Sequence, residues 1–220
     1  MDRYTYITRL SRIEEDLPKL GNTINALKIT DAGTYGQNLE ALGIDAARRA
    51  ERIACSLRNL IFTADLVAPT VLMEWIAREQ GISITHTPEL VEITLPGLMP
   101  KRNKKGNSAY LTDPLYYSLE AYVKEHDLPH FGECVVCFTH VFDRKLSARR
   151  IRDYDNLECK QILDTAAGFL MTDDSGLLCD AYHTTRLGDS DCTILSVMDR
   201  SLFPKWLSDH EKGANPVSFF

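Results

Sequence analysis

The sequence predicts an α/β protein in which a small mixed sheet with two helices follows an N-terminal helical region. Through the first third of the chain, leucine, isoleucine and alanine recur at three- and four-residue steps, as in amphipathic helices. From residue 82 the period changes, and short β-branched or apolar runs alternate with helical segments. The expected organisation is a helical region over 1–82, an α/β domain over 88–200 and a C-terminal tail over 201–220.

The N-terminal region is expected to contain three helices. The most regular apolar stripe runs from Leu39 to Leu60 and leaves three arginines away from its seam. That seam needs a partner surface, which the first helix, a third helix or a second copy of the chain would supply. Pro69 in a first helical turn and Gly81 as a stop signal delimit the third helix. The expected role of this region is packing, dimerisation or the binding of a protein partner.

The second region is expected to run strand, helix, strand, helix, strand, strand. Its first strand is Leu90–Leu95, and Asp113-Pro114 then provides an N-cap followed by proline in the first helical turn. The nearly continuous apolar run over 134–142 indicates a central strand that is covered on both faces. A second helix is expected over 156–168, and the last two strands, which are candidates for a hairpin, over 177–184 and 192–197.

Composition and charge exclude several classes of protein. With 44% hydrophobic and 25% charged residues, the chain is too apolar to be disordered. It has no run of about 20 apolar residues that would span a membrane and no signal-peptide pattern at its beginning, so a cytoplasmic protein is expected. The six cysteines are spread through apolar contexts, which does not indicate a disulfide framework. The net charge of -6 argues against a globally basic nucleic-acid coat protein but is compatible with a basic patch.

Two acidic motifs are candidate metal sites. Asp153 and Asp155 precede the second helix of the α/β region, and an extended chain would point both to one side. Carboxylates about 5 Å apart repel by about 3 kcal/mol at an effective dielectric constant near 20, which bound Mg²⁺ or Mn²⁺ would relieve. The alternative is a reciprocal helix cap formed by Asp155 and Glu158. Asp173 and Asp174 follow the same helix, where the helix dipole disfavours them, and a turn is the alternative.

Basic residues gather in two runs, one after the first strand and one just before the first acidic motif. Each run in isolation is typical of a solvated loop. In a chain that is acidic overall, a basic run beside carboxylates favours contacts with a phosphate backbone, because a bound cation would cancel the repulsion between carboxylates and phosphate. The candidate DNA-binding residues are Lys101, Arg102, Lys104, Lys105, Arg149, Arg150 and Arg152.

The order of these motifs resembles that of the RusA-like Holliday junction resolvases, a family of crossover junction endodeoxyribonucleases. The resemblance covers about residues 90–198 and includes the segment ITLPG with its basic loop, Asp153-x-Asp155-Asn156, a helix, Asp173-Asp174 and a strand pair. It implies a RusA-like fold and a Mg²⁺-dependent endonuclease that acts on branched DNA in recombination and repair. It also implies that Asp153, Asp155 and Asp174 are the essential acidic residues, with Asp173 as a candidate outer ligand.

One position departs from the family pattern. Family members carry a functional lysine four residues after the second aspartate, where this chain has Cys159, followed by Lys160. Lys160 is therefore the candidate for stabilising the charge that develops in the reaction. Two alternatives remain open: a catalytically inactive RusA-fold protein that binds nucleic acid or acts as a scaffold, and a helical interaction protein whose α/β part supports the N-terminal seam.

The expected length of the second helix predicts a homodimer. Thirteen helical residues from 156 to 168 span about 20 Å. Unless the following turn doubles back, one chain cannot gather Asp153, Asp155 and Asp174 around one ion. A two-fold dimer would do so by taking the first two aspartates from one subunit and the third from the other. A core role is expected for the Cys134-x-x-Cys137 pair. Structural roles are expected for His140 and His183, with an approach of either ring to the acidic site as the alternative.

Overall fold

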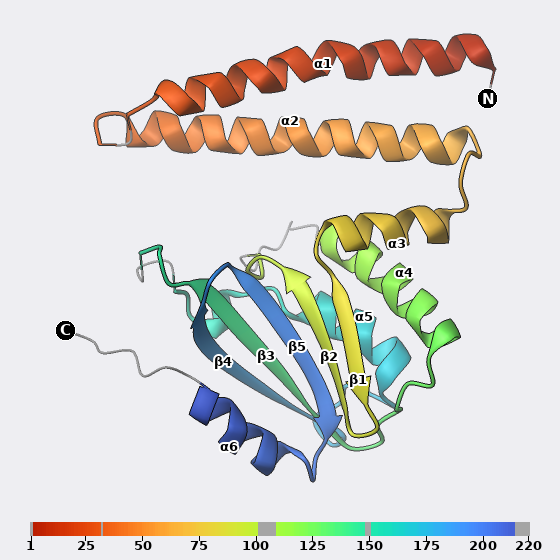
Figure 1. The fold of residues 1–220 in the computed structure, drawn as a ribbon, viewed down its shortest axis with the longest axis vertical. Coiled ribbons are helices and arrows are strands. Elements are labelled where there is room, and N and C mark those ends of the chain that lie inside the picture. The colour runs from red at the N-terminus through yellow and green to blue at the C-terminus, as the bar shows by residue number, and fades with distance from the viewer. Residues whose placement is uncertain (1, 32, 101–108, 148–150, 214–220) are drawn as a thin grey trace. The chain divides into compact units, whose positions relative to one another are not determined.

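The computed structural model describes residues 2–31, 33–100, 109–147 and 151–213 (Figure 1). These residues form six α-helices and a five-stranded mixed sheet, which confirms the mixed α/β class. Within these ranges no helix combines the length and the apolar character needed to cross a membrane. The chain divides into two compact units at Pro69. This division precedes the expected boundary at residue 82 by one helix, α3 (Pro69–Glu79), because Ala77 of α3 belongs to the core of the second unit.

The first unit is a hairpin of two long helices, α1 (Arg3–Ile29) and α2 (Gly36–Thr63). Its seam is closed by Ile13 of α1 together with Ile53 and Leu60 of α2. The apolar stripe expected on α2 therefore finds its partner surface on α1. The burial of these side chains pairs the two helices. Two side-chain hydrogen bonds also join them, from Arg9 to Thr63 Oγ1 at 2.8 Å and from Thr23 Oγ1 to Asp45 at 3.1 Å.

The sheet of the second unit has the strand order β1-β2-β5-β3-β4. β3 lies antiparallel to β5 on one side and parallel to β4 on the other. Every residue of β3 except Asp143 is buried, which confirms the central strand. The strands are β1 (Ser83–Thr87), β2 (Leu90–Pro96), β3 (Cys134–Asp143), β4 (Cys179–Gly188) and β5 (Cys192–Asp199).

Two features of the sheet differ from expectation. β1 is an additional edge strand, whose residues alternate between exposed and half-buried positions and which pairs with β2. The expected hairpin of the last two strands is wrong, because β3 lies between β4 and β5. The crossover from β3 through helix α5 (Lys160–Leu170) places β4 parallel on one edge of β3, so β5 pairs with the opposite edge.

Helices cover both faces of the sheet (Figure 1). Helix α4 (Ala109–Glu125) and α5 form the main core with one face, which includes Phe138 of β3. On the other face, Phe203 and Trp206 of helix α6 (Phe203–Gly213) pack beside Tyr182 of β4. The tail expected over 201–220 thus begins with an amphipathic helix, and residues 214–220 lie outside the described part of the chain.

Helix α4 does not begin where its sequence predicts. It already includes Ala109, so Asp113 is not its N-cap and Pro114 lies inside the helix. Because proline has no backbone N–H, it cannot donate to the Tyr110 carbonyl one turn earlier. The side chain of Gln80 donates to that carbonyl instead, at 3.3 Å. A hydrogen bond from outside the helix therefore satisfies a carbonyl that the proline cannot.

Helix α5 begins at Lys160 rather than at residue 156, after a short 3-10 helix, η2 (Tyr154–Asn156). This turn removes the extended geometry that was expected to align Asp153 with Asp155. The expected Asp155–Glu158 cap is not formed, because the N-cap of α5 is Cys159 and it makes no capping side-chain hydrogen bond. Asp153, at the N-cap of η2, makes none either. Helix capping therefore does not account for these acidic residues.

Candidate functional site

The candidate site lies on the α5 side of the sheet, where β3 and β4 run parallel. In their register Phe138 is opposite His183, and His140 is opposite Thr185. Residues two apart in a strand point to the same face, so all four side chains share this face. The short helix η2 lies against the same residues, because the Tyr154 hydroxyl is 3.0 Å from Thr185 Oγ1.

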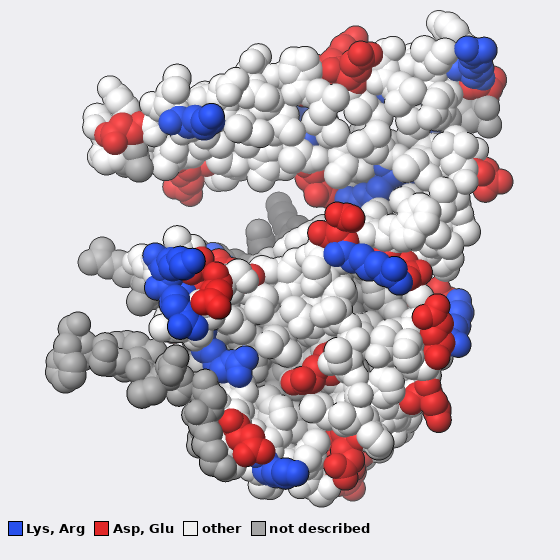
Figure 2. Space-filling model, in the orientation of Figure 1, with Lys and Arg blue, Asp and Glu red and all other residues white. Residues whose placement is uncertain are grey.

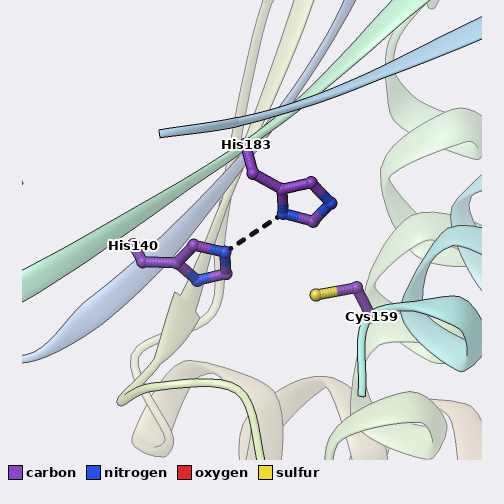
Figure 3. A group of neighbouring side chains, drawn as sticks. All are labelled: His140, Cys159 and His183. Carbon is purple, nitrogen blue, oxygen red and sulfur yellow. Dashed lines mark hydrogen bonds between the residues drawn. The ribbon is translucent and has the colours of Figure 1, made fainter. Parts of the chain in front are cut away.

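Aromatic rings stack on this face around His183. Its ring lies 5.3 Å from Phe138, 5.6 Å from His140 and 5.2 Å from Tyr154, measured between ring centroids. His140 Nε2 and His183 Nδ1 face each other at 3.3 Å (Figure 3). A neutral imidazole carries one N–H, so one ring donates this hydrogen bond and the other accepts it.

Burial keeps the two rings neutral and the neighbouring thiol protonated. His140 is 1% exposed, and burial together with the nearby His183 lowers its pKa to about 4. Burial also lowers the pKa of His183. The Cys159 thiol points into the space beside the two rings (Figure 3), and burial, with the charge of Glu158 adding to it, raises its pKa to about 12.

These three side chains form a group with metal-ligand spacing. The ligand atoms of His140, Cys159 and His183 all lie within 4.8 Å of one another. Across the described ranges no other set of three His, Cys, Asp or Glu residues is as closely spaced. Asp153 and Asp155 therefore do not meet Asp174 in a single chain, and the site shared between two subunits stays a prediction.

A cleft of about 330 Å³ opens beside this group, at the start of α5. Cys159 and His183 form part of its lining. The charged side chains that line it are Asp155, Glu158 and Lys160, so it combines oxygen donors with a cation. Two of the residues predicted for the active site, Asp155 and Lys160, therefore share one concave surface.

Lys160 is held by its own helix. Its Nζ lies 2.9 Å from Asp164 Oδ1, one helical turn away. This hydrogen bond is the main cause that raises the pKa of Lys160, and the charges of Asp174 and Glu158 raise it further. The acidic motif after α5 thus acts on the residue that begins the helix, although ten residues of helix separate them.

Of the other predicted site residues, some lie in the described part of the chain and others do not. Asp173 Oδ1 accepts a hydrogen bond from the Ser175 N–H at 3.2 Å, which agrees with the turn interpretation of this motif. Arg152 is exposed. Figure 2 shows Lys and Arg side chains gathered near the ends of β3 and β4, where Arg144 and Lys145 are exposed. The remaining candidate DNA-binding residues lie outside the described part of the chain: Lys101, Arg102, Lys104, Lys105, Arg149 and Arg150.

Sequence reasoning missed the histidine–cysteine group. It preferred structural roles for His140 and His183 to an approach to the acidic site, and it treated Cys159 only as a replaced lysine. The strand pattern around each histidine was visible, but the parallel register that brings the two strands together is not encoded locally. The expectation for the Cys134-x-x-Cys137 pair is confirmed: both thiols are free and buried in the core.

Comparison with known proteins places the chain in one family. Residues 2–219 match DUF6100, a family of unknown function, and the chain belongs to that family. No curated protein matches the chain. The functional assignment therefore rests on the residues and their geometry.

Proposed function

We propose that this protein is a Mg²⁺-dependent endonuclease that cleaves Holliday junctions or other branched DNA in the cytoplasm. The observation that carries the proposal is the cleft at the start of α5, where Asp155, Glu158 and Lys160 meet. The motif order that resembles the RusA-like resolvases supports the reaction class. The six free cysteines fit a reducing compartment.

The carboxylates of the first acidic motif, of which Asp155 lines the cleft, fit a hard divalent cation. Carboxylate oxygens are the ligands that Mg²⁺ and Mn²⁺ prefer, and neither Asp153 nor Asp155 is occupied as a helix cap. We propose these two residues and Asp174 as ligands, with Asp173 as an outer ligand. When bound, the cation would activate a water molecule and stabilise the charge that develops on the leaving oxygen.

The chain's own basic residues would bind and orient the DNA. Lys160 lines the cleft, and its ammonium, which pairs with Asp164, would turn to a phosphate bound there. Arg144, Lys145 and Arg152 are exposed and would contact backbone phosphates outside the cleft. The basic residues 101–105 and 149–150 are proposed as further contacts.

A homodimer would complete the metal site. Because Asp174 does not join Asp153 and Asp155 in one chain, we propose that a second copy supplies it. Two such sites would suit a substrate that must be cut on two strands. Apolar side chains of the first unit that remain exposed, including Leu17 and Ile24 of α1, would contact the second copy or a protein partner.

A cleavage assay tests the proposal. Labelled four-way junctions and linear duplexes of the same sequence would be incubated with the protein, with and without Mg²⁺. We expect Mg²⁺-dependent cleavage of the junction, loss of cleavage in Asp155→Asn, and retained or tighter junction binding in that variant. Asp127→Asn removes an exposed carboxylate that does not line the cleft and is the matched control. Cleavage at the wild-type rate by Asp155→Asn would contradict the assignment.

One observation favours an inactive nucleic-acid-binding protein of the same fold as the second candidate. At the position where RusA-like resolvases carry a lysine, this chain has Cys159, which lies near two histidines. The neighbouring Lys160 pairs with Asp164. The two candidates differ in their response to Mn²⁺. A metal-binding nuclease should show a rise in melting temperature with Mn²⁺ that an Asp153→Asn variant lacks, whereas an inactive protein should show the same small response in both.

A further inference from the structure

His140, His183 and Cys159 form a ligand set that the proposed nuclease chemistry does not use. Mg²⁺ takes oxygen ligands, whereas imidazole nitrogen and thiolate sulfur suit zinc and other transition metals. The three residues come from three separate elements, β3, β4 and the N-cap of α5. Their ligand atoms converge on one small volume (Figure 3).

The spacing of the two nitrogens matches a tetrahedral site. Zn–N bonds are about 2.0–2.1 Å, so two nitrogens on one tetrahedral zinc ion lie about 3.3–3.4 Å apart. His140 Nε2 and His183 Nδ1 are 3.3 Å apart. With a Zn–S bond of about 2.3 Å, the sulfur would lie about 3.5–3.6 Å from each nitrogen. The Cys159 sulfur lies within 4.8 Å of one ring nitrogen of each histidine, so it would have to move closer to the rings to occupy the third corner of the tetrahedron.

Burial of the His140 imidazole costs free energy unless its nitrogens have partners. Its ring is 1% exposed and lies on the core face of the central strand. Among the described residues its Nδ1 has no hydrogen-bond partner, so the contact with His183 is what compensates for the burial of this ring. At 3.3 Å this contact is long for a hydrogen bond between two neutral rings. A cation to one side of the line that joins the two nitrogens would bind both of them directly at about 2.0–2.1 Å.

We propose that His140, His183 and Cys159 bind one zinc ion, with the fourth coordination position open to the cleft at the start of α5. Cys159 and His183 line that cleft, so a water molecule or a ligand in the cleft would reach the ion. Three protein ligands and one open position are the arrangement of catalytic rather than structural zinc sites. Binding converts the Cys159 thiol to a zinc thiolate and releases its proton to solvent, while both imidazoles bind in their neutral form. The site does not depend on the proposed Mg²⁺ chemistry.

Metal titration of the full-length protein tests this proposal. After treatment with a chelator, Zn²⁺ would be titrated against a chromophoric competitor. We expect one tight site per chain, which excess Mg²⁺ does not displace. Cys159→Ser and His183→Ala should weaken Zn²⁺ binding by at least about 100-fold, since loss of a direct ligand exceeds the 10–100-fold effect of losing an outer partner.

Two matched variants control for unspecific effects. Cys192→Ser removes another half-buried thiol and His130→Ala an exposed histidine, and neither residue belongs to the group. Both should retain wild-type Zn²⁺ affinity. Asp155→Asn should also retain it while losing cleavage, which separates a failure of this proposal from a failure of the proposed nuclease function.

Cobalt spectroscopy gives a readout that does not require any variant to fold. Co²⁺ in a site with one thiolate and two imidazoles should show a thiolate-to-metal charge-transfer band and the intense visible bands of tetrahedral coordination. Wild-type protein that binds Co²⁺ without a thiolate band would overturn the proposal. Equal Zn²⁺ affinity in wild type and Cys159→Ser would overturn it as well.

Discussion

Acidification should destabilise the metal-free protein through His140. In the folded chain, burial and the nearby His183 lower the pKa of His140 from 6.5 to about 4. Between these two values the unfolded chain binds a proton that the folded chain does not, so stability falls as the pH falls through this window. At pH 4 this difference between the pKa values of the folded and unfolded chain lowers the free energy of unfolding by about 3 kcal/mol from this one ring. His183 acts in the same direction, because burial also lowers its pKa.

Urea unfolding in the presence of a chelator, followed by tryptophan fluorescence, would measure this loss. Trp75 and Trp206 both lie in the second unit, so their emission reports on the domain that contains His140. His140→Phe keeps a ring in the stack but removes the titrating group. Its free energy of unfolding should depend less on pH between 6.5 and 4, by up to about 1.4 kcal/mol per pH unit.

The comparison of slopes separates this effect from the general acid lability of the protein. Carboxylates protonate at low pH in every variant, so the difference between wild type and His140→Phe isolates the buried ring. His130→Phe changes an exposed histidine and should keep the wild-type slope. Parallel curves for wild type and His140→Phe from pH 6.5 to 4 would refute the reasoning.

Two further predictions concern assembly and packing. If Asp174 of one subunit completes the site of its partner, an equal mixture of Asp155→Asn and Asp174→Asn chains should recover about a quarter of the wild-type cleavage. Random pairing makes half of the dimers mixed, and each mixed dimer has one intact site of two. No recovery would place the site within one chain. Gly188→Ala should destabilise the protein by about 1–3 kcal/mol in urea unfolding, because the added methyl group would lie 2.5 Å from Val141 Cγ1. Gly168→Ala, in helix α5 with open space around its Cα, should instead stabilise it by about 0.5–1 kcal/mol, and the reverse order of the two variants would contradict this account.

Local sequence signals located most elements but not their pairing. The leucine and alanine periodicity of α2 and the continuous apolar run of β3 were sufficient to identify a seam helix and a central strand, because burial imposes these patterns directly on the chain. The start of α4 was misplaced, because proline is most common in the first turn of a helix and Pro114 was assigned to that turn. The hydrogen bond from Gln80 to the Tyr110 carbonyl is formed only in the folded chain. The expected hairpin of the last strands failed because two strands adjacent in sequence can be separated in the sheet by a third.

In the candidate site, too, local sequence signals identified some residues and missed those that only strand pairing brings together. Asp153, Asp155 and Lys160 were found because acidic and basic residues at close spacing are conspicuous in sequence, and the structure places the last two in one cleft. His140 and His183, 43 residues apart, became neighbours only through the parallel pairing of their strands.

Local patterns along the chain were enough to predict the mixed α/β class, the N-terminal helices, the buried central strand and the position of the acidic motif before α5. Each of these follows from side-chain polarity along a short stretch of chain. The strands that lie beside β3 became known from the folded domain alone, and their order is what brings two neutral histidines and a thiol together at the edge of the cleft. Strand order is set by which apolar faces are buried together, and that balance of free energy belongs to the whole domain.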